Sequence, residues 1–167
     1  MEYAHIQEFF FRIDTLEPKH RIRLKRSCGM LLRETDAETM QVFFRVLPKD
    51  VPGWLEDHWF TAVCIHCLWK AEEENRKPMQ ECIAAVKELE GTSESFEKRF
   101  TTLLETPWED DGFLCRKMER MAKYMKQKGY AVDGAPLLRD LLYWDHEDKF
   151  VQKQWIKTYW QMTQKED

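Results

Sequence analysis

Residues 111–128, DGFLCRKMERMAKYMKQK, show the pattern that decides the fold class. Their apolar side chains recur every three or four positions, as in the buried stripe of an α-helix. These side chains are Leu114, Met118, Met121, Ala122 and Met125. Arg116, Arg120 and Lys123 recur on the opposite side, whereas the side chains of a β-strand would alternate with a period of two. The stretch therefore predicts an amphipathic helix with one basic face.

Pieces of similar length continue in both directions from this stretch, because proline and glycine interrupt the chain at regular intervals. Leu and Met number 23 and Val and Ile number 13, a balance that favours helix over strand. We expect nine helices near residues 2–14, 19–33, 36–47, 55–70, 78–90, 93–105, 111–128, 136–145 and 147–163. The sequence thus predicts an all-α fold, a compact helical bundle in a single domain.

Two polar stretches are candidate loops, ENRKP at residues 74–78 and EGTSES at residues 90–95. Either can separate an N-terminal lobe of about residues 1–90 from a C-terminal lobe of about residues 91–167.

Polar residues at the expected helix starts are candidate caps. Thr35 and Glu38 have the spacing of a capping box, in which each side chain accepts a hydrogen bond from the other residue's backbone N–H. Asp133 and Asp145 are candidate N-caps, because a carboxylate satisfies free backbone amides at the positive end of the helix dipole.

Composition excludes several classes of protein. Apolar residues make up 43% of the 167 residues, enough to build a core, and the apolar run 60–69 is far shorter than the roughly 20 residues that span a bilayer. The first residues, MEYAHIQEFF, lack the basic leader of a secretion signal. Five widely spaced cysteines are typical of reduced thiols. We therefore expect a cytoplasmic protein without a membrane segment.

Positive charge gathers in two stretches, although the formal net charge of the chain is −4. Residues 18–33, PKHRIRLKRSCGMLLR, contain six Lys or Arg and no acid, and residues 116–128 contain six with one acid, Glu119. On the expected helix 19–33, Lys19, Arg26 and Arg33 align at intervals of seven residues. Solvated helix faces usually pair Glu with Lys four residues apart, so a face of one sign indicates that a polyanion supplies the counter-charge. An ordinary solvated surface remains the alternative for any single helix.

Four motifs follow one another in the C-terminal half: FEKRFTTLLE (96–105), LCRKMERMAKYMKQKG (114–129), DGAPLLRDLLYWD (133–145) and VQKQWIKTYW (151–160). Their order and spacing resemble CasB, the small subunit of the type I-E CRISPR effector complex called Cascade. In the N-terminal half, Arg21, Leu24, Lys25 and Arg26 match a basic motif of that family, and FFRVLP (43–48) is similar to its Leu-Pro helix end. The resemblance covers most of the chain and is weakest over residues 50–90.

The resemblance implies a non-catalytic, all-helical protein that joins the complex as two adjacent copies, beside the backbone subunits and in contact with the large subunit. It also implies that the basic surface binds guide RNA and target DNA and stabilises the R-loop, meaning the heteroduplex and the displaced single strand. Base pairing reads the sequence in such a complex, so the protein needs only backbone contacts. The candidate nucleic-acid-binding residues are the family-matched Arg21, Lys25, Arg26, Arg99, Arg116 and Arg120, together with Lys123 on the same helix.

Some positions depart from the family pattern or have structural interpretations. Gly134 stands where the family usually has Trp, and His20 stands where a capping acid is common. Asp140 and Trp144 are assigned to structural contacts. Trp160 is a candidate for stacking on unpaired bases, with a protein contact as the alternative.

Signals for catalysis are weak. Cys64 and Cys67 form a CxxC around His66, but structural zinc needs four ligands and the sequence offers no second arm. The acidic stretch ETPWEDDG (105–112) has the character of a turn and a helix start, whereas metal nucleases gather carboxylates from several elements. We expect no catalytic residue, metal or cofactor. The alternative functions are a helical adaptor whose basic faces bind acidic partners and a small metal-dependent nuclease.

Overall fold

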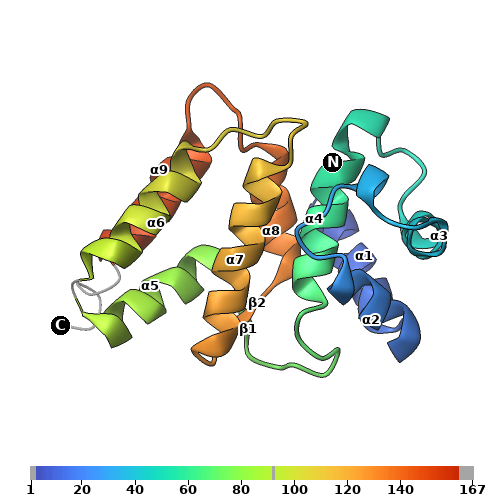
Figure 1. Ribbon diagram of the computed structural model, residues 1–167, viewed down its shortest axis with the longest axis horizontal. Helices are drawn as coiled ribbons and strands as arrows, with labels where there is room; N and C mark the ends of the chain where they lie inside the picture. Colours follow the sequence, from blue (N-terminus) through green and yellow to red (C-terminus); the bar gives the residue numbers. More distant parts are fainter. Residues whose placement is uncertain (1–2, 92, 162–167) are drawn as a thin grey trace.

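The structure, a computed structural model, describes residues 3–91 and 93–161, and within them the chain forms nine α-helices (Figure 1). These are α1 (Tyr3–Asp14), α2 (Pro18–Arg26), α3 (Ala37–Val46), α4 (Glu56–His66), α5 (Met79–Glu90), α6 (Glu94–Glu105), α7 (Phe113–Gln127), α8 (Gly134–Leu142) and α9 (Phe150–Gln161). Two 3-10 helices, η1 (Leu32–Glu34) and η2 (Gly53–Leu55), and two strands, β1 (Arg76–Lys77) and β2 (Ala131–Val132), complete the described chain. The predicted all-α fold is confirmed.

The core is built around α4. Every residue from 58 to 69 is buried, because α4 is apolar on all sides and is packed against α8, α2 and α7. α8 also packs against α1, and α5 packs against α9. In Figure 1, α6 and α7 lie in front of α9 and α8, so these four helices form two layers beside α1–α4. The buried side chains of both halves belong to one hydrophobic cluster, and the division into lobes near residue 90 stays a prediction. None of the described helices combines the length and the apolar character that a membrane-spanning segment needs.

The helix expected over residues 19–33 is shorter than predicted and ends at Arg26. Gly29 has φ +88°, a left-handed conformation that stops the helix. A Cβ atom at this position would lie 1.8 Å from Oε2 of Glu119, so the chain after α2 presses directly on α7. The alignment of Arg33 with Lys19 and Arg26 is therefore wrong, because Arg33 lies on η1.

The caps agree with the sequence in part. The N-cap of α3 is Asp36, whose carboxylate accepts a hydrogen bond from the backbone N–H of Thr39, so the predicted Thr35–Glu38 capping box is wrong. Asp133 caps α8 as predicted, accepting from the N–H of Ala135. Asp145 is not an N-cap: α9 begins at Phe150, and the Asp145 carboxylate accepts from the N–H of Trp108.

The predicted loop 74–78 contains strand β1, which pairs in parallel with β2. Arg76 explains the pairing, because its guanidinium donates hydrogen bonds to the carbonyls of His66, Lys70 and Val132. The helix predicted over residues 55–70 accordingly ends at His66, where this arginine takes up its terminal carbonyl. The last predicted helix extended to residue 163, and its final residues, Met162 included, lie outside the described residues.

The departures and structural assignments in α8 have clear physical reasons. A Cβ atom at Gly134 would lie 2.3 Å from a ring carbon of Phe10, so the tryptophan of the resembled family has no room here. The Asp140 carboxylate accepts a hydrogen bond from the indole of Trp155, and the indole of Trp144 donates to the carbonyl of Thr106. Both residues therefore make the structural contacts that the sequence predicted.

Candidate nucleic-acid interface

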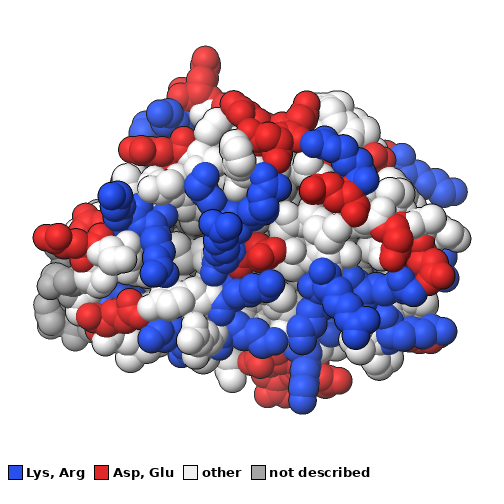
Figure 2. Space-filling view, viewed as in Figure 1, with Lys and Arg blue, Asp and Glu red and all other residues white. Residues whose placement is uncertain are grey.

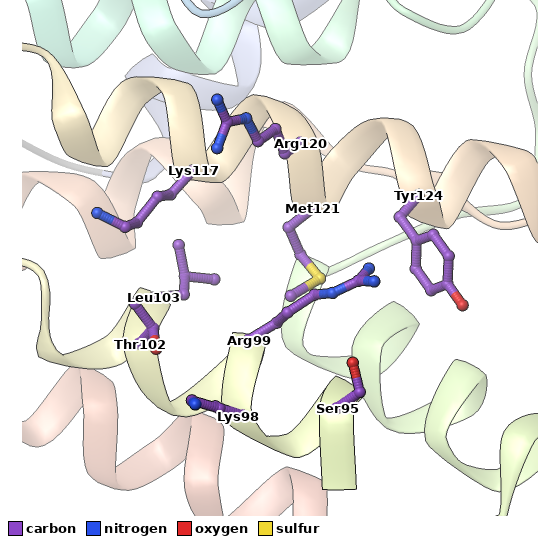
Figure 3. A pocket seen from close by; sticks show the side chains of 9 residues that line it. All are labelled: Ser95, Lys98, Arg99, Thr102, Leu103, Lys117, Arg120, Met121 and Tyr124. Carbon is purple, nitrogen blue, oxygen red and sulfur yellow. The ribbon is translucent and has the colours of Figure 1, made fainter. Parts of the chain in front are cut away.

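A groove of about 460 Å³ lies between α6 and α7 (Figure 3). The α6 side contributes the amphipathic turns of FEKRFTTLLE, whose Phe96, Phe100 and Leu103 are buried. The α7 side contributes the outward, basic face of the amphipathic helix Phe113–Gln127. Together the two helices line the groove with Ser95, Lys98, Arg99, Thr102, Leu103, Lys117, Arg120, Met121 and Tyr124.

Four of these nine side chains are cations, and none is a carboxylate. Leu103 and Met121 form an apolar floor, and Arg99 extends over Met121 towards Tyr124 (Figure 3). The guanidinium carbon of Arg99 lies 5.4 Å from the centre of the Tyr124 ring, within the range of a cation–π contact. Lys98, Arg99 and Arg120 form no salt bridge among the described residues, although the Glu90 carboxylate interacts with the charge of Arg99 from beyond the groove lining.

Lys and Arg form a broad band on the face of the molecule that carries α2, α6 and α7, and most Asp and Glu lie around this band (Figure 2). On this face the cations are gathered together and are not mixed evenly with the acids. A surface of one sign creates a field that attracts a polyanion and concentrates it along the band.

Arg116 and Lys123, the other predicted site residues of α7, already have partners within the protein. Arg116 is half-buried, donates a hydrogen bond to the carbonyl of Asp111 and lies 5.2 Å from the ring centre of Phe113. Lys123 forms a salt bridge of 3.5 Å with Glu119, the one acid of this stretch. Both side chains lie at the surface, but an incoming phosphate has to compete with these contacts.

Arg21 lies in the interior, contrary to its expected place on a binding face. Its side chain is 10% exposed, and its guanidinium contacts Asp14 at 3.3 Å and the carbonyl of Trp69 at 3.2 Å. Asp14 is also hydrogen-bonded to His66, and these partners hold the pKa of its carboxyl below the usual value against the opposing effect of burial. Arg21 therefore links α2 to α1 and α4 and is not open to phosphate.

Other cations of residues 18–33 are bound within the protein. Arg23 forms salt bridges with Asp36 and Glu38 at the start of α3. Arg33 donates a hydrogen bond of 2.7 Å to the carbonyl of Asp110, and Lys19 lies 3.5 Å from Glu17. These contacts reduce the charge that the stretch presents to a ligand.

Lys25 and Arg26 remain exposed and form no salt bridge within the described chain. Lys25 lies near Lys126 of α7, whose pKa is lowered by burial and by the positive charge of Lys25. Lys126 also donates a hydrogen bond to the carbonyl of Leu68. Neither ammonium group forms a salt bridge with a described carboxylate, so the positive charge of α2 continues into that of α7.

Three residues of this surface, Lys98, Lys117 and Lys126, were not among the predicted site residues. Lys98 precedes Arg99 in the family-like motif, and Lys117 and Lys126 flank the basic stripe of α7. Two adjacent basic residues on each of two neighbouring helices, Lys98-Arg99 and Arg116-Lys117, are the signal that points to Lys98 and Lys117. Trp160, the candidate stacking residue, lies on α9, where its ring contacts the ammonium group of Lys87 at 4.3 Å.

The CxxC pair has the environment of core residues. All five cysteines are free and buried, and burial raises the pKa of the Cys67 thiol to about 12 and that of the Cys64 thiol well above its usual value. Such thiols are protonated and poor nucleophiles. Among the described residues, no three His, Cys, Asp or Glu side chains come close enough to hold a metal ion.

The acidic turn before α7 makes structural contacts. Asp111 accepts a hydrogen bond from the N–H of Phe113, and its backbone carbonyl accepts from Arg116. Glu105, Glu109 and Asp110 are exposed and do not converge on a cleft.

A family model described as CRISPR-associated protein Cse2 matches residues 21–160 of this chain. The chain belongs to the Cse2 family. A comparison with curated protein sequences gives no match.

Solved structures of Cse2 and CasB proteins have the same fold. The chain is 21% identical to CasB of M. ruber, with a TM-score of 0.74 over 99% of this chain and 97% of that one. It is 19% identical to a CRISPR-associated protein of the Cse2 family from Thermus thermophilus, with a TM-score of 0.75 over 95% of this chain and 97% of that one. A chain of a CRISPR RNA-guided surveillance complex is 21% identical, with a TM-score of 0.76 over 99% of both chains.

Proposed function

We propose that this Cse2-family protein is a non-catalytic subunit of a type I-E CRISPR surveillance complex, in which its basic face holds a nucleic-acid backbone. The groove between α6 and α7 carries this proposal, because it combines four cations with an apolar floor and has no carboxylate in its lining. A phosphodiester chain offers closely spaced negative charges to Lys98, Arg99, Lys117 and Arg120, and releases its bound counter-ions when they engage.

The geometry suits binding without sequence preference. Long, flexible lysine and arginine side chains reach phosphates, and Leu103 and Met121 offer contacts to sugars, so neither set reads base edges. In the complex the guide RNA selects the target by base pairing. The protein then stabilises the R-loop, through either the guide–target heteroduplex or the displaced strand.

The family resemblance adds the partners of this assembly. We propose that two adjacent copies act together, in contact with the backbone and large subunits, in the cytoplasm. The cations of the α6–α7 groove, continued by Lys126 of α7 and Lys25 of α2, favour an extended polyanion over a compact acidic protein. The nuclease alternative has no support in the described acidic residues, which form no cluster.

The test replaces the two groove arginines by an uncharged residue of similar length. Arg99→Gln combined with Arg120→Gln should reduce the slope of log K against log[salt] for a single-stranded oligonucleotide by about 1.4, or 0.7 for each lost phosphate contact. The matched control is Arg12→Gln with Arg45→Gln, two exposed arginines on α1 and α3. An unchanged slope in the groove variant, or an equal change in the control, would contradict the proposal.

The second readout is the assembled complex. With guide RNA and the other subunits present, the groove variant should shorten the lifetime of the R-loop while the complex still assembles. Loss of assembly with unchanged oligonucleotide binding would instead favour the adaptor alternative.

A further inference from the structure

A second groove, lined by residues of α8, α9 and α5, differs in chemistry from the groove between α6 and α7. Its volume is about 510 Å³. The lining residues are Gln80, Arg139, Asp140, Tyr143, Phe150, Val151, Lys153, Gln154 and Lys157. None of them lines the α6–α7 groove, and α8 and α9 lie behind α7 and α6 in Figure 1.

Large apolar side chains stay exposed at this groove. Tyr143 and Phe150 are 46% and 45% exposed, and their ring centres lie 5.6 Å apart. Aromatic side chains grouped at the surface mark protein interfaces more often than solvated faces, because their burial by a partner removes a large apolar area from water.

The groove also has a positive charge that the described chain does not neutralise. Lys153 and Lys157 form no salt bridge with any described carboxylate, and they lie one turn apart on α9. Arg139 contacts the ring of Tyr3 at 4.9 Å. The one carboxylate of the lining, Asp140, accepts a hydrogen bond from the indole of Trp155 and lies close enough to Arg139 to offset its charge, so the uncompensated charge is that of the two lysines. An occupant with carboxylate groups would therefore complement this surface.

The polar groups of the groove favour a peptide over a phosphodiester chain. The Oε1 atom of Gln80 is buried and accepts no hydrogen bond within the described chain, and Asp140 is a second acceptor in the lining. A peptide backbone brings N–H donors that can satisfy such acceptors, whereas a phosphodiester backbone brings only acceptors.

We propose that the α8–α9 groove docks an acidic segment of another protein, in which glutamate or aspartate residues accompany an aromatic or large aliphatic side chain. The acids pair with Lys153 and Lys157. The apolar side chain packs against Tyr143 and Phe150, and the backbone donates hydrogen bonds within the groove. This docking is independent of the nucleic-acid face, so the protein presents different surfaces to the two kinds of partner.

The experiment titrates the full chain with a short synthetic peptide of glutamate and phenylalanine and follows backbone amide signals by NMR. The shifts should be confined to the region of residues 139–143 and 150–157. Lys153→Gln with Lys157→Gln should weaken binding about tenfold, since two surface ion pairs are lost. The matched control, Lys98→Gln with Lys117→Gln in the other groove, should leave peptide binding unchanged and weaken binding of an oligothymidylate.

Three results would overturn the proposal. The first is a peptide in which glutamine replaces glutamate that binds as tightly as the acidic one. The second is an oligothymidylate that shifts the α8–α9 signals at lower concentration than the peptide, which would assign this groove to nucleic acid. The third is self-association that Lys153→Gln with Lys157→Gln abolishes, which would make a second copy the occupant. Because oligothymidylate binding is measured on the same samples, a failure of the nucleic-acid proposal is seen separately.

Discussion

Residues 18–33 and 116–128 each contain six Lys or Arg side chains, but the fold uses them differently. Around α2, which packs against α3 and α4, Arg21 is buried and Arg23 and Arg33 are bound to neighbouring acids or carbonyls. Along α7, Arg116, Lys123, Lys126 and Lys128 also have partners, but Lys117 and Arg120 form no salt bridge in the described chain and line the groove beside Lys98 and Arg99 of α6. The number of cations in a stretch therefore does not measure the charge that it offers to a ligand. The neighbours of each helix decide that charge.

The largest effect is expected in α2, where Arg21 is bound within the protein. Arg21→Met should lower the free energy of unfolding by about 3 kcal/mol, because it leaves the half-buried Asp14 without one cation and the Trp69 carbonyl without a donor. Urea denaturation measures the loss. The salt slope for oligonucleotide binding should not change, and a stable variant with a reduced slope would return Arg21 to the binding face.

Acid should lower the stability of the folded protein through a buried histidine and should leave the charge of the surface Lys and Arg unchanged. His58 is buried and stacked on Trp108, with ring centres 3.8 Å apart, and burial lowers its pKa to about 4. Between pH 6.5 and 4 the unfolded chain binds a proton at His58 that the folded chain does not, so folded stability falls as the pH falls through this window. At pH 5 the loss from this residue is about 2 kcal/mol.

The control for this titration is His58→Phe, which keeps a ring against Trp108 and has no titrating group. Its stability should fall less between about pH 7 and 5 than that of the wild type. Lys and Arg stay charged over the whole range, so the salt slope of the folded protein should be the same at both values. An equal acid response in both proteins would remove His58 as the cause.

A smaller effect on stability is expected where the chain after α2 packs against α7. Gly29→Ala should cost about 1–2 kcal/mol, since alanine resists the left-handed conformation. Its Cβ atom also meets the Glu119 carboxylate. Combining it with Glu119→Ala should recover the part due to contact and leave the backbone part. Full stability of the single variant would show that the chain after α2 does not press on α7.

The smallest effect concerns the acid on the α7 face. Glu119→Gln frees Lys123 from its salt bridge and removes a negative charge near the binding surface. It should tighten oligonucleotide binding about two- to threefold at low salt, in the range of an exposed ion pair. Fluorescence anisotropy measures this change, and Glu17→Gln, the partner of Lys19 at the start of α2, is the control. Equal tightening in both variants would show that the effect comes from the net charge of the protein and not from the position of Glu119.

Much of this fold could be predicted from periodicity and turn residues, because both depend on short spacings. The all-α class and the Asp133 cap are of this kind. The features that the sequence did not predict, such as the end of α2 and the strand β1, depend on contacts between residues that are distant in the sequence. α2 ends early because Gly29 meets Glu119, and strand β1 exists because Arg76 reaches the carbonyls of His66 and Val132.

The candidate site has the same limit. The spacing of Arg116, Arg120 and Lys123 predicted the basic face of α7, whereas Arg99 of α6 and Arg21 of α2 were predicted from the family resemblance. Burial of Arg21 depends on Asp14 and Trp69, which are distant in the sequence. The order of motifs, which does not require those contacts, was sufficient to identify the family.

The short parallel pairing of β1 with β2 has a mechanical consequence. The chain leaves the α1–α4 body at Lys77 and returns to it at Ala131, and these two points are held together by backbone hydrogen bonds and by Arg76. The pairing therefore connects the end of α7 to the start of α5, in addition to the direct packing of α7 on α4. The C-terminal end of α7 is held by this pairing. Amide hydrogen exchange at Asp133, whose N–H is bonded to the carbonyl of Lys77, reports whether the pairing opens.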